Sequence, residues 1–175
     1  MKKTILLILM FFQLLLIGKT TYKEGDIIFQ ISDSRQSNMI QMATLSPWSH
    51  CGIIVEKGKE LYVLEASNIV KLTPLQQWIA KGRYGGLHKV RRVFDKPVKV
   101  SYKKYLGKKY DLAFKMDNGK FYCSELVWVI YKEQFGTELC KPKQIRKYHI
   151  SLFKDQIKKR GIDINAYAIA PCDLL

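Results

Sequence analysis

A cysteine at the predicted start of a helix is the residue of this chain best placed for nucleophilic chemistry. Cys123 opens a run in which apolar residues recur at helical spacing, and Gly136 is expected to end that helix. Unpaired backbone N–H groups and the helix dipole favour negative charge in a first helical turn, so they lower the pKa of a thiol there. The same position is also typical of a buried core cysteine, and the interpretation therefore depends on a partner base.

A thiol nucleophile requires a histidine within reach, and the chain has three. His88 lies among lysine and arginine residues, which disfavour a cationic imidazolium, and His149 has no carboxylate close to it in the sequence. His50 opens a β-branched run, 50–55, that leads through a glycine turn into a second alternating run, 60–66. The two runs predict a β-hairpin with His50 at one end.

The hairpin supplies His50 with a carboxylate partner. If Lys57 and Gly58 are the central turn residues, His50 lies directly opposite Glu65. Opposed side chains have Cβ atoms about 4.5–5.5 Å apart on one face of the sheet. A carboxylate there would fix the imidazole tautomer and favour the imidazolium, whereas a register shift of one residue would place the two side chains on opposite faces.

The remaining segments predict one α+β domain over residues 22–175, because no linker or internal repeat interrupts them. A helical face is also expected within 70–81, after Pro74. The other expected elements are strands within 22–31, 87–94 and 166–170, and helices at 35–45, 96–109, 121–135 and 151–160.

Seven short motifs follow one another between residues 22 and 136. They are Gly25-Asp26-Ile27-Ile28-Phe29, Ser34-x-Gln36-Ser37, Ala43-Thr44-x-Ser46-x-x-Ser49-His50-x-Gly52-Ile53, Tyr62-Val63-Leu64-Glu65-Ala66, Thr73-Pro74-Leu75-x-x-Trp78, Gly107-x-x-Tyr110-Asp111 and Tyr122-Cys123-Ser124-Glu125-Leu126-Val127. As an ordered set they resemble the permuted papain-like cysteine amidases and peptidases, the YiiX/YebB-type branch of the NlpC peptidase superfamily.

The resemblance implies a circularly permuted papain-like fold, in which a small antiparallel, barrel-like sheet packs on the helix that starts at the nucleophile. Cys123 then matches the nucleophile, His50 the base and Glu65 the orienting acid. Tyr110 matches a tyrosine that can hydrogen-bond near the developing oxyanion, and the backbone N–H of Cys123 is expected to contribute to the oxyanion hole. We expect no cofactor and no metal, since no metal-ligand spacing or glycine-rich phosphate loop is visible.

The N-terminus has the form of a secretory signal. Lys2 and Lys3 precede an apolar run over 4–17, which is short for a membrane span. We therefore assign residues 1–21 to a signal peptide or an uncleaved anchor, with a buried N-terminal helix as the alternative. Export would place the protein in the periplasm, in the cell envelope or outside the cell.

Export bears on the cysteines other than Cys123. Cys140 and Cys172 could form a disulfide in an oxidising compartment, or could remain two free thiols. Cys51 follows the expected base at a position where a small apolar residue is expected. Because successive strand residues point to opposite faces, we expect Cys51 to point away from the site, into the core.

The charge suggests an anionic partner. The 175 residues have 30 Lys and Arg against 15 Asp and Glu, and the 47% hydrophobic content excludes a disordered chain. A cysteine amidase or peptidase acting on cell-wall-type peptides is the first hypothesis, and a lipid-directed acyl hydrolase or acyltransferase with the same triad is the second. A non-catalytic binding module is the third. Export argues against nucleic acid as the partner, and the oligomeric state is left open.

Overall fold

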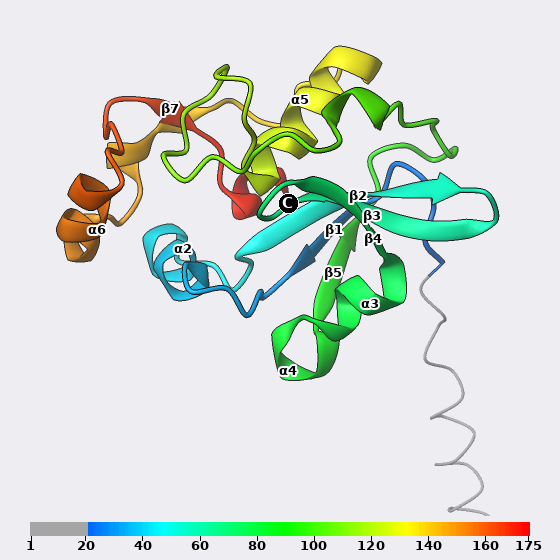
Figure 1. Ribbon diagram of the computed structural model, residues 1–175, viewed down its shortest axis with the longest axis horizontal. Coiled ribbons are helices and arrows are strands. Elements are labelled where there is room, and N and C mark those ends of the chain that lie inside the picture. Colours follow the sequence, from blue (N-terminus) through cyan, green and yellow to red (C-terminus); the bar gives the residue numbers. More distant parts are fainter. Residues whose placement is uncertain (1–20) are drawn as a thin grey trace, which may run out of the picture.

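A five-stranded antiparallel sheet forms the centre of the molecule (Figure 1). The computed structural model describes residues 21–175, so nearly all of the predicted signal or anchor segment lies outside the described residues. The strands lie side by side in the order β4-β3-β2-β1-β5. Their bounds are Ile27–Gln30 for β1, His50–Lys57 for β2, Glu60–Ala66 for β3, Val70–Pro74 for β4 and His88–Arg91 for β5.

Helices cover both faces of this sheet. Helix α5 (Cys123–Phe135) packs on one face, against β2 and β3, and α3 (Leu75–Ala80) with the short α4 (Arg83–Gly86) packs on the other. Strand β2 is consequently buried on both faces up to Val55. Between residues 21 and 175, no helix is long and apolar enough to cross a membrane.

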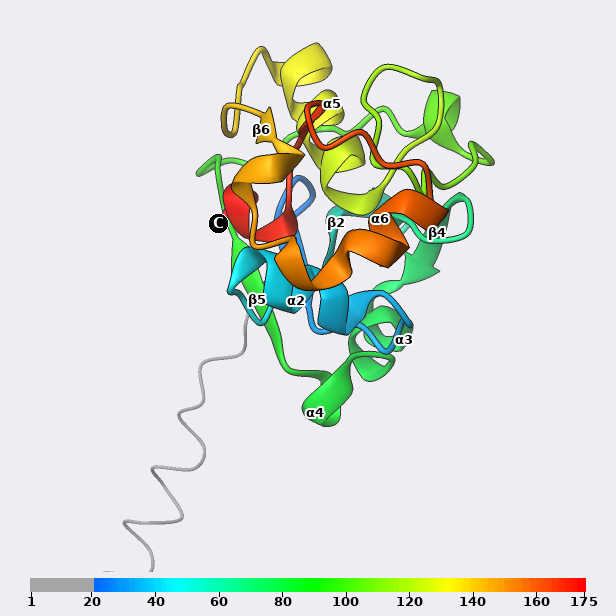
Figure 2. The ribbon, with the colours of Figure 1, turned by 90° about the vertical axis from the view of Figure 1, so that its left-hand side faces the viewer.

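A smaller layer lies beyond one end of the sheet. Helix α2 (Ser37–Thr44) lies beside α6 (Lys154–Lys159), as Figures 1 and 2 both show. The segment before α6 is tied to α2 by a hydrogen bond from the His149 N–H to the Ala43 carbonyl. A two-stranded ribbon completes this layer. It consists of β6 (Lys143–Gln144) and β7 (Tyr167–Ala168), with 3-10 turns at Ile145–Lys147, Ser151–Phe153 and Pro171–Leu174.

The hairpin forms as predicted, but its register differs from the prediction. Lys57 pairs with Glu60, so Gly58 and Lys59 are the central turn residues, and Val55 pairs with Tyr62 rather than with Glu60. The physical reason is Gly58, whose φ of +68° suits the first central position of a tight hairpin turn. The shift is two residues, which keeps every side chain on its predicted face.

The new register changes how the predicted base and acid meet. His50 pairs across the other edge of β2 with Gln30 of β1, and the β2–β3 register, continued by one residue, places Gly52 beside Glu65. His50 and Glu65 are therefore diagonal neighbours on one face rather than directly opposed. Diagonal neighbours remain within reach of long side chains.

The prediction of a helix over 96–109 is wrong. Only Lys103–Tyr105 forms a 3-10 turn there. The Val98 and Val100 N–H groups donate instead to the backbone and side chain of Glu24, and Val100 is buried. Alternating β-branched residues with a buried partner favour an extended path, and this outweighs the Lys- and Tyr-rich composition of the segment, which suggested a surface helix.

The other predicted elements have the expected type with different bounds. The helix expected at 121–135 begins at Cys123 and is followed by Gly136 in the left-handed conformation. The helix expected at 151–160 forms as a 3-10 turn and α6, and the strand expected at 166–170 is the short β7.

Gly52 is a position where the sheet tolerates no side chain. A Cβ atom built there would lie 2.4 Å from Val63 Cγ1 and 2.6 Å from the Leu64 carbonyl oxygen. We expect Gly52→Ala to force β2 and β3 apart and to lower the free energy of unfolding by about 1–3 kcal/mol. Urea denaturation measures this, with the exposed Glu56→Ala on the same strand as the matched control. Equal midpoints for the two variants would contradict the close packing.

Candidate active site

A buried carboxylate lies at the centre of the candidate site. Glu65 Oε2 is 2.6 Å from His50 Nε2 and accepts a hydrogen bond from Trp78 Nε1 at 3.1 Å, while Oε1 accepts one from Thr73 Oγ1 at 2.6 Å. The Trp78 ring also stacks on the imidazole, with centroids 5.8 Å apart. Strand β4 and helix α3 thus hold the carboxylate of β3, and the carboxylate holds the imidazole of β2.

The two partners shift each other's pKa in opposite directions. Burial alone would lower the pKa of His50, but hydrogen bonds and charge interactions with Cys123 and Glu65 outweigh it and raise the pKa to about 10. Burial alone would raise the pKa of Glu65, but His50 and then Thr73 lower it to about 2. At neutral pH the pair is therefore an imidazolium next to a carboxylate.

Cys123 is the first residue of α5 and is 3% exposed. Its thiol lies close enough to His50 and to the Cys51 thiol for both groups to shift its pKa. The Cys51 hydrogen bond lowers the pKa of Cys123 most, burial opposes it, and the hydrogen bond and charge of His50 lower the pKa further, to well below its ordinary value. Because Nε2 of His50 faces Glu65, Nδ1 is the nitrogen left for the thiol.

Cys51 lies in the core as expected, but it does not point away from the site. Cys51 is fully buried and belongs to the same core cluster as Cys123, as expected for the face of β2 that packs on α5. That face is where the first turn of α5 lies, so Cys51 points toward the nucleophile and not away from the site. Burial and the neighbouring Cys123 raise the pKa of Cys51 itself, so it acts as a thiol donor.

Tyr110 lies at the edge of the same cluster. It forms an isolated bridge with Phe121, two residues before the nucleophile, and its side chain packs against the core cluster that contains Cys123. Its hydroxyl oxygen accepts a hydrogen bond from Gln36 Nε2 at 3.0 Å. Burial and then the nearby Cys123 charge raise the pKa of the phenol well above its ordinary value, which keeps its proton available for donation.

Three residues gained no role from the sequence, although each stood inside a quoted motif. Thr73 and Trp78 donate to Glu65, and Gln36 donates to Tyr110. Thr73 and Trp78 carried a signal, a hydroxyl and an indole N–H next to apolar residues, because a buried polar group requires a partner. The motif around Gln36 is polar throughout and carried no such signal. His88, which was not chosen as the base, instead contacts Tyr22 and the Gly86 carbonyl.

An apolar cavity of about 100 Å³ opens beside Cys123. Its walls come from α2, the first turn of α5, the α6 region and the C-terminal segment, and nearly all of its surface is carbon. Its lining includes Ala43 of α2, Cys123 of α5 and Ile169 of the C-terminal segment.

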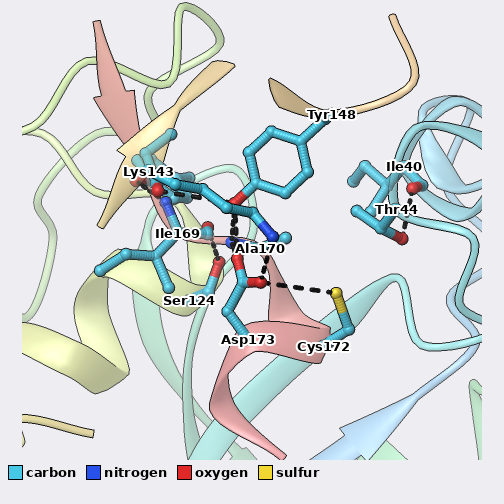
Figure 3. A network of polar contacts seen from close by, with 11 residues as sticks. Ile40, Thr44, Ser124, Lys143, Tyr148, Ile169, Ala170, Cys172 and Asp173 are labelled. Carbon is cyan, nitrogen blue, oxygen red and sulfur yellow. Dashed lines mark hydrogen bonds and ion pairs between the residues drawn. The ribbon is translucent and has the colours of Figure 1, made fainter. Parts of the chain in front are cut away.

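Residues on both sides of the nucleophile hold the C-terminal wall of this cavity. Ser124 Oγ donates to the Ile169 carbonyl at 2.7 Å, and the Ile169 N–H donates to Tyr122 Oη at 3.1 Å. Figure 3 shows the Ser124 contact and the polar network behind it, in which the Ala170 N–H donates to Asp173 and to Tyr148 Oη.

Lys143 forms an ion pair with Asp173 at 2.8 Å in the same network, and Cys172 lies at its edge (Figure 3). Cys172 and Cys140 both carry free thiols, which is the second of the two alternatives considered for them.

Comparison with known proteins identifies the family. A family model described as permuted papain-like amidase, YaeF/YiiX, C92 family, matches residues 21–168. The uncharacterized protein YiiX of Escherichia coli K12 is 42% identical over 141 residues, which cover 77% of this chain and 69% of that protein. The crystal structure of YiiX from E. coli O157:H7, described as a metalloprotein, superposes with a TM-score of 0.79 and 38% identity, covering 87% of this chain and 91% of that one.

The description of that relative as a metalloprotein raises the question of a metal ligand set here. Within residues 21–175, no group of three or more His, Cys, Asp or Glu side chains is arranged to hold a metal ion. The donor set of this part of the chain therefore does not fit a resident metal.

The shifted pKa of Cys123 predicts unusual thiol reactivity. We expect Cys123 to be alkylated by iodoacetamide at pH 6 more than about 10²-fold faster than Cys140, because the thiolate is the nucleophile and burial raises the pKa of Cys140 to about 11. The rate at each cysteine is measured by mass spectrometry between pH 4 and 10. A midpoint for Cys123 near 8.5, as in an unperturbed thiol, would contradict the assignment.

A matched pair of variants isolates the contribution of Cys51. Cys51→Ala removes the thiol donor, so the alkylation midpoint of Cys123 should move to higher pH. Cys172→Ala, at the edge of the polar network, should leave it unchanged.

Proposed function

The chain belongs to the C92 family of permuted papain-like amidases, and on that basis we propose that it hydrolyses amide or peptide bonds through a triad of Cys123, His50 and Glu65. At the level of the family it is a cysteine hydrolase with a permuted papain-like fold. The observation that carries the finer proposal is the buried Glu65–His50 pair, 2.6 Å apart, together with the thiol at the start of α5, whose pKa is lowered by His50.

The reaction follows from the protonation states. The Cys123 thiolate attacks the carbonyl carbon of the substrate, and His50, already an imidazolium, protonates the departing amine. The product is a thioester on Cys123. A water molecule then gives a proton to the neutral imidazole and attacks the thioester, which releases the carboxylic acid and restores the thiolate. Glu65 stabilises the imidazolium in both halves of the reaction.

Two groups can donate to the oxyanion of the tetrahedral intermediate. The N–H of Cys123 belongs to the first turn of α5 and has no partner within the helix. The Tyr110 hydroxyl keeps its proton at neutral pH. We propose that both face the developing negative charge, where such donors contribute most.

Cell-wall-type peptides are the first substrate class that we propose. Residues 21–175 keep 27 of the 30 basic residues and all 15 acidic ones, so the excess of positive charge belongs to the folded domain. Such a surface attracts peptides that carry free carboxylates, and it would also contact an anionic envelope. The proposal includes export of the protein to the envelope or beyond it.

Substitution of the triad tests the chemistry. We expect Cys123→Ala and His50→Ala to abolish release of product from muropeptides or acyl-amino-acid amides. Glu65→Gln should reduce kcat by about 10²–10⁴-fold, because it removes the charge that stabilises the imidazolium. Product release is followed by mass spectrometry, and full turnover by Cys123→Ala would disprove the assignment. Thermal melting of each variant reports whether the fold is intact.

The apolar cavity favours a second candidate, a lipid-directed acyl hydrolase or acyltransferase with the same triad. A cavity lined almost entirely by carbon, with the nucleophile in its wall, suits an aliphatic acyl group better than a charged peptide stem. Segment 141–160 near the cavity carries eight Lys and Arg against one acidic residue, and Leu152 within it is 71% exposed. Basic and apolar residues together are typical of a surface that contacts anionic lipid.

A series of acyl chain lengths separates the two candidates. If the cavity holds the acyl group, kcat/KM for p-nitroanilides should rise about fourfold per methylene from acetyl upward, since each buried CH₂ contributes about 0.8 kcal/mol. Ala43→Leu, which narrows the cavity, should flatten this rise, while the exposed Met42→Leu on the same helix should not. A rate independent of chain length would contradict the acyl-binding role and favour peptides.

A further inference from the structure

The amide of Gln36 connects Arg160, which follows α6, to Tyr110 in the candidate active site. Gln36 precedes α2 as its N-cap residue, and its Nε2 lies 3.0 Å from Tyr110 Oη. Its Oε1 lies 3.2 Å from Nη1 of Arg160, the residue that follows α6. Two segments that are distant in the sequence therefore meet behind the Tyr110 hydroxyl.

Arg160 determines the direction of the two hydrogen bonds that link it through Gln36 to Tyr110. A guanidinium has only donors, so it must face the oxygen of the Gln36 amide, and the NH₂ group must face Tyr110. The Tyr110 oxygen is therefore the acceptor of that bond. The single hydroxyl proton of Tyr110 is left free to point elsewhere.

Cys123 belongs to the core cluster against which Tyr110 packs. Tyr110 packs against the core cluster that contains Cys123 and Cys51, and the charge of Cys123 acts on its phenol. A carbonyl group attacked by Cys123 would have its oxygen in this neighbourhood.

We propose that Gln36 and Arg160 are positioning residues that orient the hydroxyl proton of Tyr110 toward the oxyanion. The inference rests on the proposed function, and it adds what makes Tyr110 a donor rather than an acceptor. Arg160 orients Gln36, Gln36 orients Tyr110, and only Tyr110 contacts the reacting group.

The test compares two reactions of the same thiol. Acylation of Cys123 by p-nitrophenyl acetate passes through an oxyanion, whereas alkylation by iodoacetamide does not. The informative variant is Gln36→Glu. Its carboxylate still pairs with Arg160, but it can only accept a hydrogen bond from Tyr110, so the hydroxyl proton points toward residue 36 and away from the oxyanion. We expect acylation to fall about 10²-fold, as for the loss of one oxyanion donor, while the alkylation rate and its pH midpoint stay within about twofold.

A double-mutant cycle shows whether Gln36 acts through Tyr110. Tyr110→Phe should reduce acylation as much as Gln36→Glu does, and the double variant should be no slower than Tyr110→Phe alone. Arg160→Gln, which no longer fixes the amide, should give an intermediate loss of acylation with normal alkylation.

Three outcomes would overturn the inference without contradicting the proposed function. Acylation by Gln36→Glu at the wild-type rate would show that the direction of the bond is irrelevant. Equal losses in acylation and alkylation would show a structural or thiol effect, and multiplied losses in the double variant would show independent roles. A wild-type protein that is alkylated at Cys123 but never acylated would instead contradict the proposed function, and this inference with it.

Discussion

The buried carboxylate of Glu65 is the constraint on which the rest of the site depends. A charge removed from water is costly unless it is paired and fully hydrogen-bonded, and Glu65 meets this requirement with three donors from three different elements. Satisfying it fixes the rotamer of His50, the depth of Trp78 and the contact between β4 and α3. The same carboxylate keeps the imidazole charged, and the imidazolium helps to keep Cys123 a thiolate.

The charged part of the candidate site and its apolar cavity meet at Cys123. The thiol interacts with the charge of His50, which pairs with Glu65, and it also belongs to the wall of an almost wholly apolar cavity. The low polarity of that wall strengthens charge interactions nearby, so the cavity and the triad support each other electrostatically. Ser124 and Tyr122 secure this boundary because both bind the backbone of Ile169.

Local patterns were sufficient to predict the helix at Cys123, the hairpin and the pairing of His50 with Glu65. The exact register was not predictable in the same way, since it depended on which residues around Gly58 form the turn. Because the register differs by two residues, His50 and Glu65 stay on one face, and the prediction that they pair holds although the predicted register is wrong. A one-residue difference would have separated them.

Contacts between distant segments lay beyond the reach of these patterns. The cavity walls come from α2, α5, the α6 region and the C-terminal segment, and no period or motif links their residues. Cys51 is a second example. The alternation of side chains along a strand predicted its face correctly, but it could not show that the first turn of α5 packs on that face. The extended path around Val98 and Val100 followed from Glu24, which is far away in the sequence.

The order of the site residues along the chain has a consequence for folding kinetics. His50 and Glu65 are 15 residues apart within one hairpin, so bringing them together closes a short loop. Cys123 joins them only when α5 docks on the completed sheet, a contact of much greater sequence separation. Recovery of thiol reactivity after dilution from denaturant therefore reports the docking of this helix, whereas sheet formation alone leaves an ordinary, slowly reacting cysteine.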